Sequence, residues 1–183
     1  MNTIEKINDT ICTCTLCELH KTRNQAVPGE GATNATIMII GEGPGEENDK
    51  TGRPFVGRGG QILDKFLLKV GLNREELFLT NIIKCRMPHN ATPTNNVVEK
   101  CIGYLDQQIE LINPKIIVTL GLSAAKEILK NKKLKLSDMK NQTFNLGNTK
   151  VLCTYHPSSI RYNKDASNEI INTLIRAKAL GTL

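Results

Sequence analysis

The chain has 183 residues, a length typical of one domain with its own hydrophobic core. Its composition, 39% hydrophobic and 23% charged, is that of a globular protein, and no apolar run approaches the ~20 residues that a membrane-spanning helix needs. The net charge of +6 favours a polyanionic partner, and the absence of a signal-peptide pattern at the start predicts a cytoplasmic protein, which we expect to be a monomer.

The first predicted element is a strand at 36–41, a continuous apolar run that ends at Gly41 and suits burial on both faces. A helix is predicted at 59–70, where apolar residues recur at helical spacing as far as Gly71, a residue suited to ending a helix. The remaining predictions, in chain order, are a strand at 77–83, a helix at 95–112, a strand at 115–120, a helix at 122–131, a strand at 149–155 and a helix at 166–180.

This alternation predicts an α/β fold, a three-layer sandwich in which helices cover both faces of a four-stranded parallel sheet. No repeat or linker divides the chain, so we expect residues 1–183 to form a single domain. Ligands of parallel sheets bind beyond the carboxyl ends of the strands. Glycine and polar residues occur at those ends, at 41–45, at Thr80 and Asn81, and at 155–158.

Six cysteines in a chain without a secretion signal indicate metal binding or redox chemistry rather than disulfides. Two of them are separated by two residues near the N-terminus, and two more lie far along the chain with fifteen residues between them. Four thiolates from two regions fit either a tetrahedral zinc site or a [4Fe–4S] cluster, and the wide second gap favours the cluster. The expected ligands are Cys14, Cys17, Cys85 and Cys101, with Cys12 as an alternative to Cys14 and Cys153 expected as a buried thiol.

Three segments, at 41–57, 80–86 and 156–159, resemble motifs of the family 4 uracil-DNA glycosylases. The four cysteines match that family in order and spacing, and the similarity extends over residues 12–175. The resemblance implies a uracil-glycosylase fold with an architectural [4Fe–4S] cluster. It also implies hydrolysis of the N-glycosidic bond of deoxyuridine in single- or double-stranded DNA, which releases uracil and leaves an abasic site.

A glycosylase must extrude its base, recognise it and stabilise the departing anion. The resemblance implies that Phe55 offers an aromatic face on which uracil stacks. The alternative is that Phe55 is an ordinary residue of the hydrophobic core. Asn81 carries both a donor and acceptors and can pair with the pyrimidine edge, excluding cytosine through its amino group. His156 can donate to the uracil carbonyl where negative charge develops.

The loop after the first strand supplies the remaining substrate contacts. Gly41 and Gly43 permit close approach of the backbone. Glycine loops also cradle phosphates, but no Gly-Lys-Ser/Thr occurs here. The wider superfamily carries an aspartate where this chain has Gly43, so Glu42 is the nearest carboxylate that could handle water or position the loop. Asn90 is expected in the same network, while Asn48 stands where an acidic residue is expected.

The segment that follows His156 is expected to contact DNA. Serine hydroxyls suit phosphate contacts, and an aliphatic side chain can enter the gap left by a flipped base. The expected DNA-binding residues are Ser158, Ser159, Ile160 and Arg161.

Two other functions are possible. One superfamily branch becomes covalently trapped on abasic DNA, but it carries a basic insertion that the short segment 85–90 lacks. A chain of a different class would be a non-catalytic DNA-binding module with a zinc or iron–sulfur staple. The joint presence of Phe55, Asn81 and His156 favours the glycosylase.

Overall fold

A computed structural model describes residues 3–182 and contains one six-stranded sheet with the strand order β1-β3-β2-β4-β6-β5. The four inner strands are parallel, as predicted. The expected four-stranded sheet is corrected at its edges, where two short strands add antiparallel pairs. With two and three residues, these strands are too short to show a periodic pattern. The strands are β1 (Glu30–Gly31), β2 (Ile37–Gly41), β3 (Phe78–Asn81), β4 (Ile116–Leu120), β5 (Phe144–Leu146) and β6 (Thr149–Thr154).

The four predicted helices are present: α3 (Arg58–Val70), α4 (Asn95–Ile112), α5 (Leu122–Ile128) and α7 (Ala166–Gly181). Three further α-helices were not predicted: α1 (Ile4–Cys12), α2 (Glu46–Thr51) and α6 (Leu136–Met139). Short 3₁₀ turns complete the set: η1 (Glu18–Lys21), η2 (Arg74–Glu76), η3 (Pro88–Asn90) and η4 (Pro157–Arg161). The signal for α1 was available, because Thr3 caps it and its buried isoleucines recur at helical spacing.

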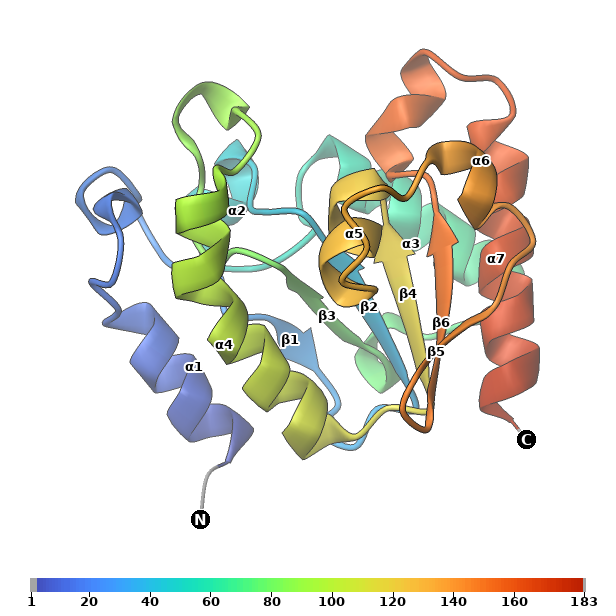
Figure 1. The fold of residues 1–183 in the computed structure, drawn as a ribbon, viewed down its shortest axis with the longest axis horizontal. Coiled ribbons are helices and arrows are strands. Elements are labelled where there is room, and N and C mark those ends of the chain that lie inside the picture. The colour runs from blue at the N-terminus through green and yellow to red at the C-terminus, as the bar shows by residue number, and fades with distance from the viewer. Residues whose placement is uncertain (1–2, 183) are drawn as a thin grey trace.

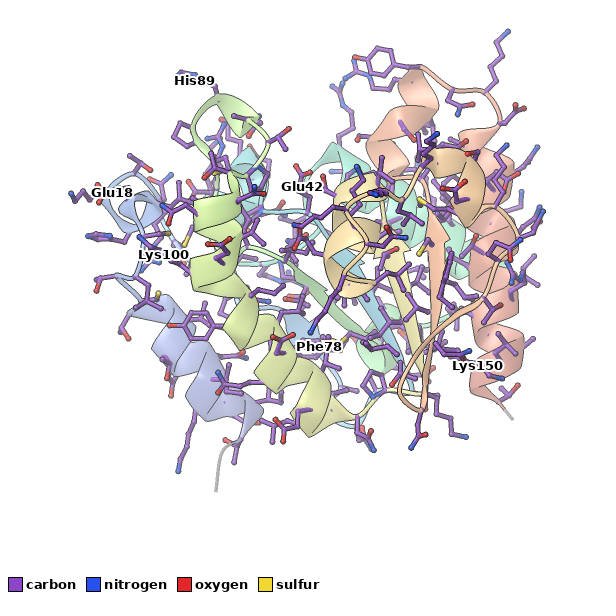
Figure 2. The ribbon with its side chains drawn as sticks, viewed as in Figure 1. Glu18, Glu42, Phe78, His89, Lys100 and Lys150 are labelled. Atoms are coloured by element: carbon purple, nitrogen blue, oxygen red, sulfur yellow. The ribbon has the colours of Figure 1, made fainter. Side chains whose placement is uncertain are left out.

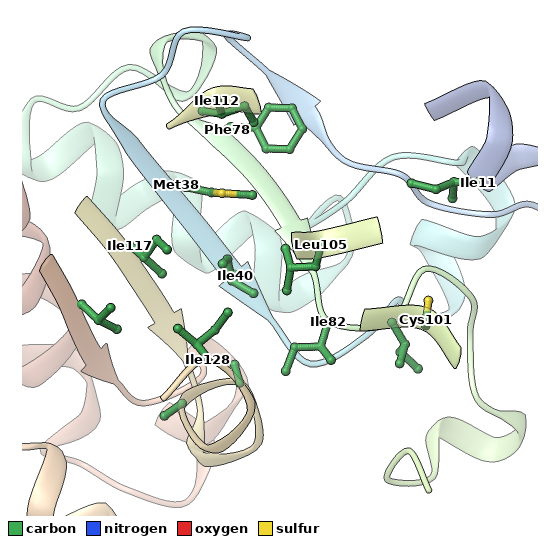
Figure 3. Packing of buried hydrophobic residues seen from close by; sticks show 14 of the residues in the cluster. Ile11, Met38, Ile40, Phe78, Ile82, Cys101, Leu105, Ile112, Ile117 and Ile128 are labelled. Atoms are coloured by element: carbon green, nitrogen blue, oxygen red, sulfur yellow. The ribbon is translucent and has the colours of Figure 1, made fainter. Parts of the chain in front are cut away.

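The helices form a layer on each face of the sheet (Figure 1). Helices α1, α4 and α5 cover one face, and α3 and α7 cover the other. Side chains of β2 alternate between the two layers: Met38 and Ile40 belong to the first cluster, whereas Ile37 and Ile39 belong to the second. Figure 3 shows the first cluster, with Met38 and Ile40 between the sheet and Leu105 of α4. Burial on both faces explains why the strand is apolar throughout.

The strand order creates a reversal point between β2 and β4. From β2 the chain first adds β3 on one side, then returns to add β4 and β6 on the other. Crevices at such points, beyond the carboxyl ends of the strands, are the usual ligand sites of open α/β sheets. None of the helices within residues 3–182 combines the length and apolar character needed to cross a membrane. The first two residues and the last one of the predicted domain lie outside the described part of the chain.

Candidate active site and cysteine site

A cavity of about 680 Å³ lies beyond the carboxyl ends of the inner strands. Segments from the whole chain line it: the loop after β2, the start of α3, the end of β3, the turn before α4 and the start of η4. Figure 2 shows Glu42 at this end of the sheet, with Phe78 deeper in the fold. The cavity brings together seven of the predicted site residues, namely Glu42, Gly43, Phe55, Asn81, Asn90, His156 and Ser158.

Phe55 and Asn81 meet over Gly41. A Cβ atom on Gly41 would lie 2.5 Å from Asn81 Oδ1 and 2.9 Å from Phe55 Cζ, so only glycine allows both side chains to pack here. Phe55 is buried, but it lines the cavity and has a positive φ of 52°. Such a φ is a strained conformation for an aromatic residue. Phe55 therefore belongs to the second core cluster and to the cavity wall at once.

Asn81 ends β3 with an amide that has no hydrogen-bond partner. The residue is only 2% exposed and lines the cavity, and no side chain or backbone group within residues 3–182 bonds to its amide. Amides in protein interiors normally have hydrogen-bond partners, and the cavity is where the Asn81 amide can meet water or a ligand. Because Asn81 lines the cavity, a ligand with complementary donors and acceptors would satisfy it.

His156 is held in one tautomer by the turn that it begins. The Ser158 N–H donates to His156 Nδ1 at 3.2 Å, and the Ser158 hydroxyl lies 2.7 Å from the same nitrogen. Because an N–H can only donate, Nδ1 is an acceptor and the proton of the neutral ring sits on Nε2. Burial lowers the pKa of His156 from its ordinary value of 6.5. The ring therefore presents a neutral N–H donor.

Three carboxylates line the cavity, and two of them are engaged elsewhere. Glu46 pairs with Lys50 at 2.9 Å, and Glu47 pairs with the same ammonium at 2.9 Å. Glu42 forms no ion pair with any residue that the structure describes. At Gly43, an added Cβ atom would lie 2.7 Å from Ile83 Cγ1. The buried Ile83 side chain thus occupies the space that an aspartate at Gly43 would need.

Asn48 shapes the loop after β2 through both ends of its amide. Its Oδ1 accepts from the Gly45 N–H at 2.9 Å, and its Nδ2 donates to the Arg53 carbonyl at 3.0 Å. A carboxylate at this position could not donate the second bond. Asn90, in the turn before α4, also lines the cavity, and its Oδ1 accepts from Arg86 Nε at 3.0 Å.

The predicted DNA-binding segment forms η4, and its side chains point in different directions. The Ser159 hydroxyl donates to the His156 carbonyl at 2.7 Å, so both serines support the histidine turn. Ile160 packs against the second core cluster, whereas Arg161 is exposed. Tyr162, which the sequence reading did not select, is 88% exposed beside it. Phosphate contacts by the serines and insertion of Ile160 stay predictions.

The four predicted cysteine ligands line one hollow between α1, η1, the segment after β3 and α4. Within residues 3–182, no three or more side chains of suitable type close on a point that would hold a single metal ion. Three of the sulfurs accept hydrogen bonds: Cys85 Sγ from Arg23 at 3.1 Å, Cys101 Sγ from the Lys84 N–H at 3.3 Å and Cys14 Sγ from the Leu16 N–H at 3.5 Å. Burial raises the pKa of the Cys85 and Cys101 thiols, and the hydrogen bonds from Arg23 and Lys84 oppose that effect by favouring the thiolates. Four cysteines that line one hollow, three of them with a hydrogen-bond donor to sulfur, fit a cluster of several irons.

The other two cysteines lie elsewhere. Cys12 is exposed and does not line the hollow, which supports Cys14 as the N-terminal partner of Cys17. Cys153 is buried in β6 within the first core cluster, as predicted, and burial raises the pKa of its thiol.

Sequence reasoning missed the cation at the junction of the two sites. Lys84 is fully buried, and its Nζ donates to Thr80 Oγ1 at 2.6 Å, to the Asn81 carbonyl at 2.9 Å and to Gln108 Oε1 at 2.7 Å. Burial lowers the pKa of this ammonium to about 7. A lysine that directly follows an apolar run and precedes one of the expected ligand cysteines was the available signal. Lys84 joins the strand of Asn81 to the cysteine hollow.

Comparison with known proteins assigns this arrangement to a class. The model of the uracil DNA glycosylase superfamily matches residues 28–176, so the chain belongs to that superfamily. The chain is 42% identical to a type-4 uracil-DNA glycosylase of Thermotoga maritima over 91% of its length and 86% of the relative's, and 43% identical to one of Pyrobaculum aerophilum over 86% and 84%. Identity to a type-5 uracil-DNA glycosylase of the latter organism is 29%, over 75% and 67%. Within the superfamily, the chain is a member of the type-4 family.

Proposed function

We propose that this cavity is where the chain hydrolyses the N-glycosidic bond of uracil in DNA, a reaction that leaves an abasic site for base excision repair. One observation carries the proposal: an amide that bonds to no other group within residues 3–182, an aromatic ring and a neutral histidine N–H donor line the same cavity. Uracil offers a flat ring, an N–H donor and two carbonyl acceptors. These are the groups that Phe55, Asn81 and His156 can contact.

In this proposal, each residue acts at a different part of the flipped base. Phe55 stacks on the ring, and Asn81 pairs with the pyrimidine edge and rejects the amino group of cytosine. As the glycosidic bond breaks, negative charge moves onto the base. His156 Nε2–H then donates to a uracil carbonyl oxygen, and a fixed donor of this kind contributes roughly 3–4 kcal/mol to transition-state stabilisation.

Water must attack the sugar carbon from which uracil departs. Glu42 is our candidate for positioning that water, because it is the cavity carboxylate that no lysine or arginine within residues 3–182 neutralises. Asn90 lines the same cavity and offers a second polar contact. Gly43 cannot contribute a side chain, so the carboxylate that the wider superfamily places there has no counterpart at that position.

The cofactor that we propose is a [4Fe–4S] cluster held by Cys14, Cys17, Cys85 and Cys101. When bound, it would tie the N-terminal segment to the chain that follows β3. The DNA that enters the cavity is proposed to cross η4, where Arg161 is exposed. Cytoplasmic location and the monomeric state stay predictions.

Asn81→Asp is expected to slow release of uracil from DNA by roughly 100-fold or more, because a buried carboxylate cannot donate to uracil and repels its developing charge. The measurement is single-turnover cleavage of an oligonucleotide with one uracil, alongside hypoxanthine and thymine substrates. Asn145→Asp, the same change on the exposed edge strand β5, should cleave at the wild-type rate. Equal rates for the two variants would contradict base reading by Asn81. Retained binding of abasic DNA would confirm that Asn81→Asp is folded.

The stability of the chain should respond to the protonation of His156. Its pKa is lowered in the folded state, so below pH 6.5 the unfolded chain binds more protons and the free energy of unfolding falls as pH decreases. Protonation of Nδ1 would also remove the acceptor for the Ser158 N–H. Thermal midpoints of the wild type and His156→Ala between pH 5 and pH 8 test this. The wild type should lose more stability than the variant on the acid side, and parallel curves would contradict the buried, neutral ring.

A further inference from the structure

Arg74, in the 3₁₀ turn before β3, contacts the loop that carries Phe55. Its Nη2 donates to the Pro54 carbonyl at 2.6 Å, and its Nη1 donates to the Phe55 carbonyl at 3.4 Å. Two successive carbonyls of one loop thus converge on a single guanidinium. Arg74 does not line the cavity, so it has no direct access to a ligand there.

Two carboxylates hold the guanidinium in place. Arg74 Nη2 lies 2.8 Å from Glu30 Oε1 on β1, and Nη1 lies 2.7 Å from Asp64 Oδ1 on α3. The Arg74 side chain is 21% exposed, so these ion pairs are partly shielded from water. The planar fork of arginine can meet four acceptors at once, which the single ammonium of lysine cannot do.

The Phe55 loop needs such support because its own conformation is unfavourable. Phe55 has a φ of 52°, in the left-handed region that phenylalanine rarely adopts. On its other side the loop meets Gly60, where a Cβ atom would lie 1.7 Å from the Phe55 carbonyl oxygen. The loop is therefore fixed between the start of α3 and the Arg74 guanidinium, with the ring turned against Gly41 and Asn81.

We propose that Arg74 is a positioning residue for uracil recognition, which acts by holding the Phe55 ring in its strained stacking position. This inference rests on the proposed function, in which Phe55 is the stacking platform. Arg74 itself touches neither the base nor the sugar. Its contribution is transmitted through the Pro54 and Phe55 carbonyls, and it affects binding of the base rather than of the DNA backbone.

The test is a double-mutant cycle between Arg74→Lys and Phe55→Ala, read as kcat/KM on single-stranded uracil DNA. Arg74→Lys keeps a cation beside Glu30 and Asp64 but loses the fork, and we expect about a ten-fold loss. In the Phe55→Ala background the same change should have no further effect, because no ring remains to be held. Affinity for abasic DNA should stay at the wild-type value in every variant. The midpoint temperature of unfolding is measured for each variant, so that activity is compared only between folded proteins. If Arg74→Lys is unfolded, Arg74→Gln takes its place.

Arg53→Lys is the matched control. Arg53 pairs with the same carboxylate, Nε to Glu30 Oε2 at 2.8 Å, but its side chain is exposed and makes no bond to the Phe55 loop carbonyls. It should cleave at the wild-type rate. The inference about Arg74 would be overturned if Arg53→Lys lost as much kcat/KM as Arg74→Lys. It would also be overturned if Arg74→Lys lowered kcat/KM equally in the Phe55→Ala background. Neither result would affect the proposed function. A wild-type chain that released no uracil would overturn the proposed function and this inference with it.

Discussion

His156→Ala should lower the single-turnover rate of uracil release by about 100-fold or more, since a fixed donor to developing negative charge is worth roughly 3–4 kcal/mol. The structural reason is the tautomer: the Ser158 N–H occupies Nδ1 and leaves the proton on Nε2. The neutral ring needs no ion-pair partner and adds no charge to the cavity before the bond breaks. Rapid-quench cleavage of an end-labelled oligonucleotide with saturating protein measures the rate.

Binding of abasic DNA separates this role from a structural one. That product lacks the base that His156 addresses, so its affinity for His156→Ala should match that of the wild type. His89→Ala is the control, because His89 is exposed on the turn before α4 and lies outside the cavity lining (Figure 2). A wild-type rate for His156→Ala together with a slow His89→Ala would mean that the wrong histidine has been assigned.

Cys85→Ala should reduce bound iron from about four atoms per chain to a small fraction of that amount and lower the midpoint temperature of unfolding. Cluster ligation requires four thiolates, and the free energy of metal binding contributes to folding. Cys85 is also the sulfur that accepts from Arg23, so its loss leaves that guanidinium with the Cys12 carbonyl as its remaining acceptor among residues 3–182. Iron analysis and visible absorption of protein purified without air measure the cofactor, and a colourless chain that contains zinc would favour the alternative metal.

Cys153→Ala is a closely matched control for this change. Cys153 is 5% exposed and Cys85 is 7% exposed, so the two substitutions delete the same atom from comparably buried positions. Cys153→Ala should keep its full iron content while losing some stability to the cavity that it creates. Full iron content in Cys85→Ala would remove Cys85 from the ligand set.

The sequence by itself determined the layers of the fold and most of the lining of the site. Continuous apolar runs predicted the four inner strands, because a strand buried on both faces must be apolar at every position. The carboxyl ends of those strands then had to share one edge, which brought Asn81 near Gly41 and His156. The spacing of the four cysteines, read with the family resemblance, selected the residues that line the second hollow.

Only the tertiary structure decided what holds those residues in place. The edge strands β1 and β5 have too few residues for a pattern, and their pairing depends on neighbours already in the sheet. Phe55 has a positive φ, which Arg74 supports by hydrogen bonds to the Phe55 loop. Lys84 bonds to Gln108, which lies 24 positions further along the chain. Such contacts cannot be predicted from local sequence, because each depends on how separate elements pack together rather than on the propensity of any one segment.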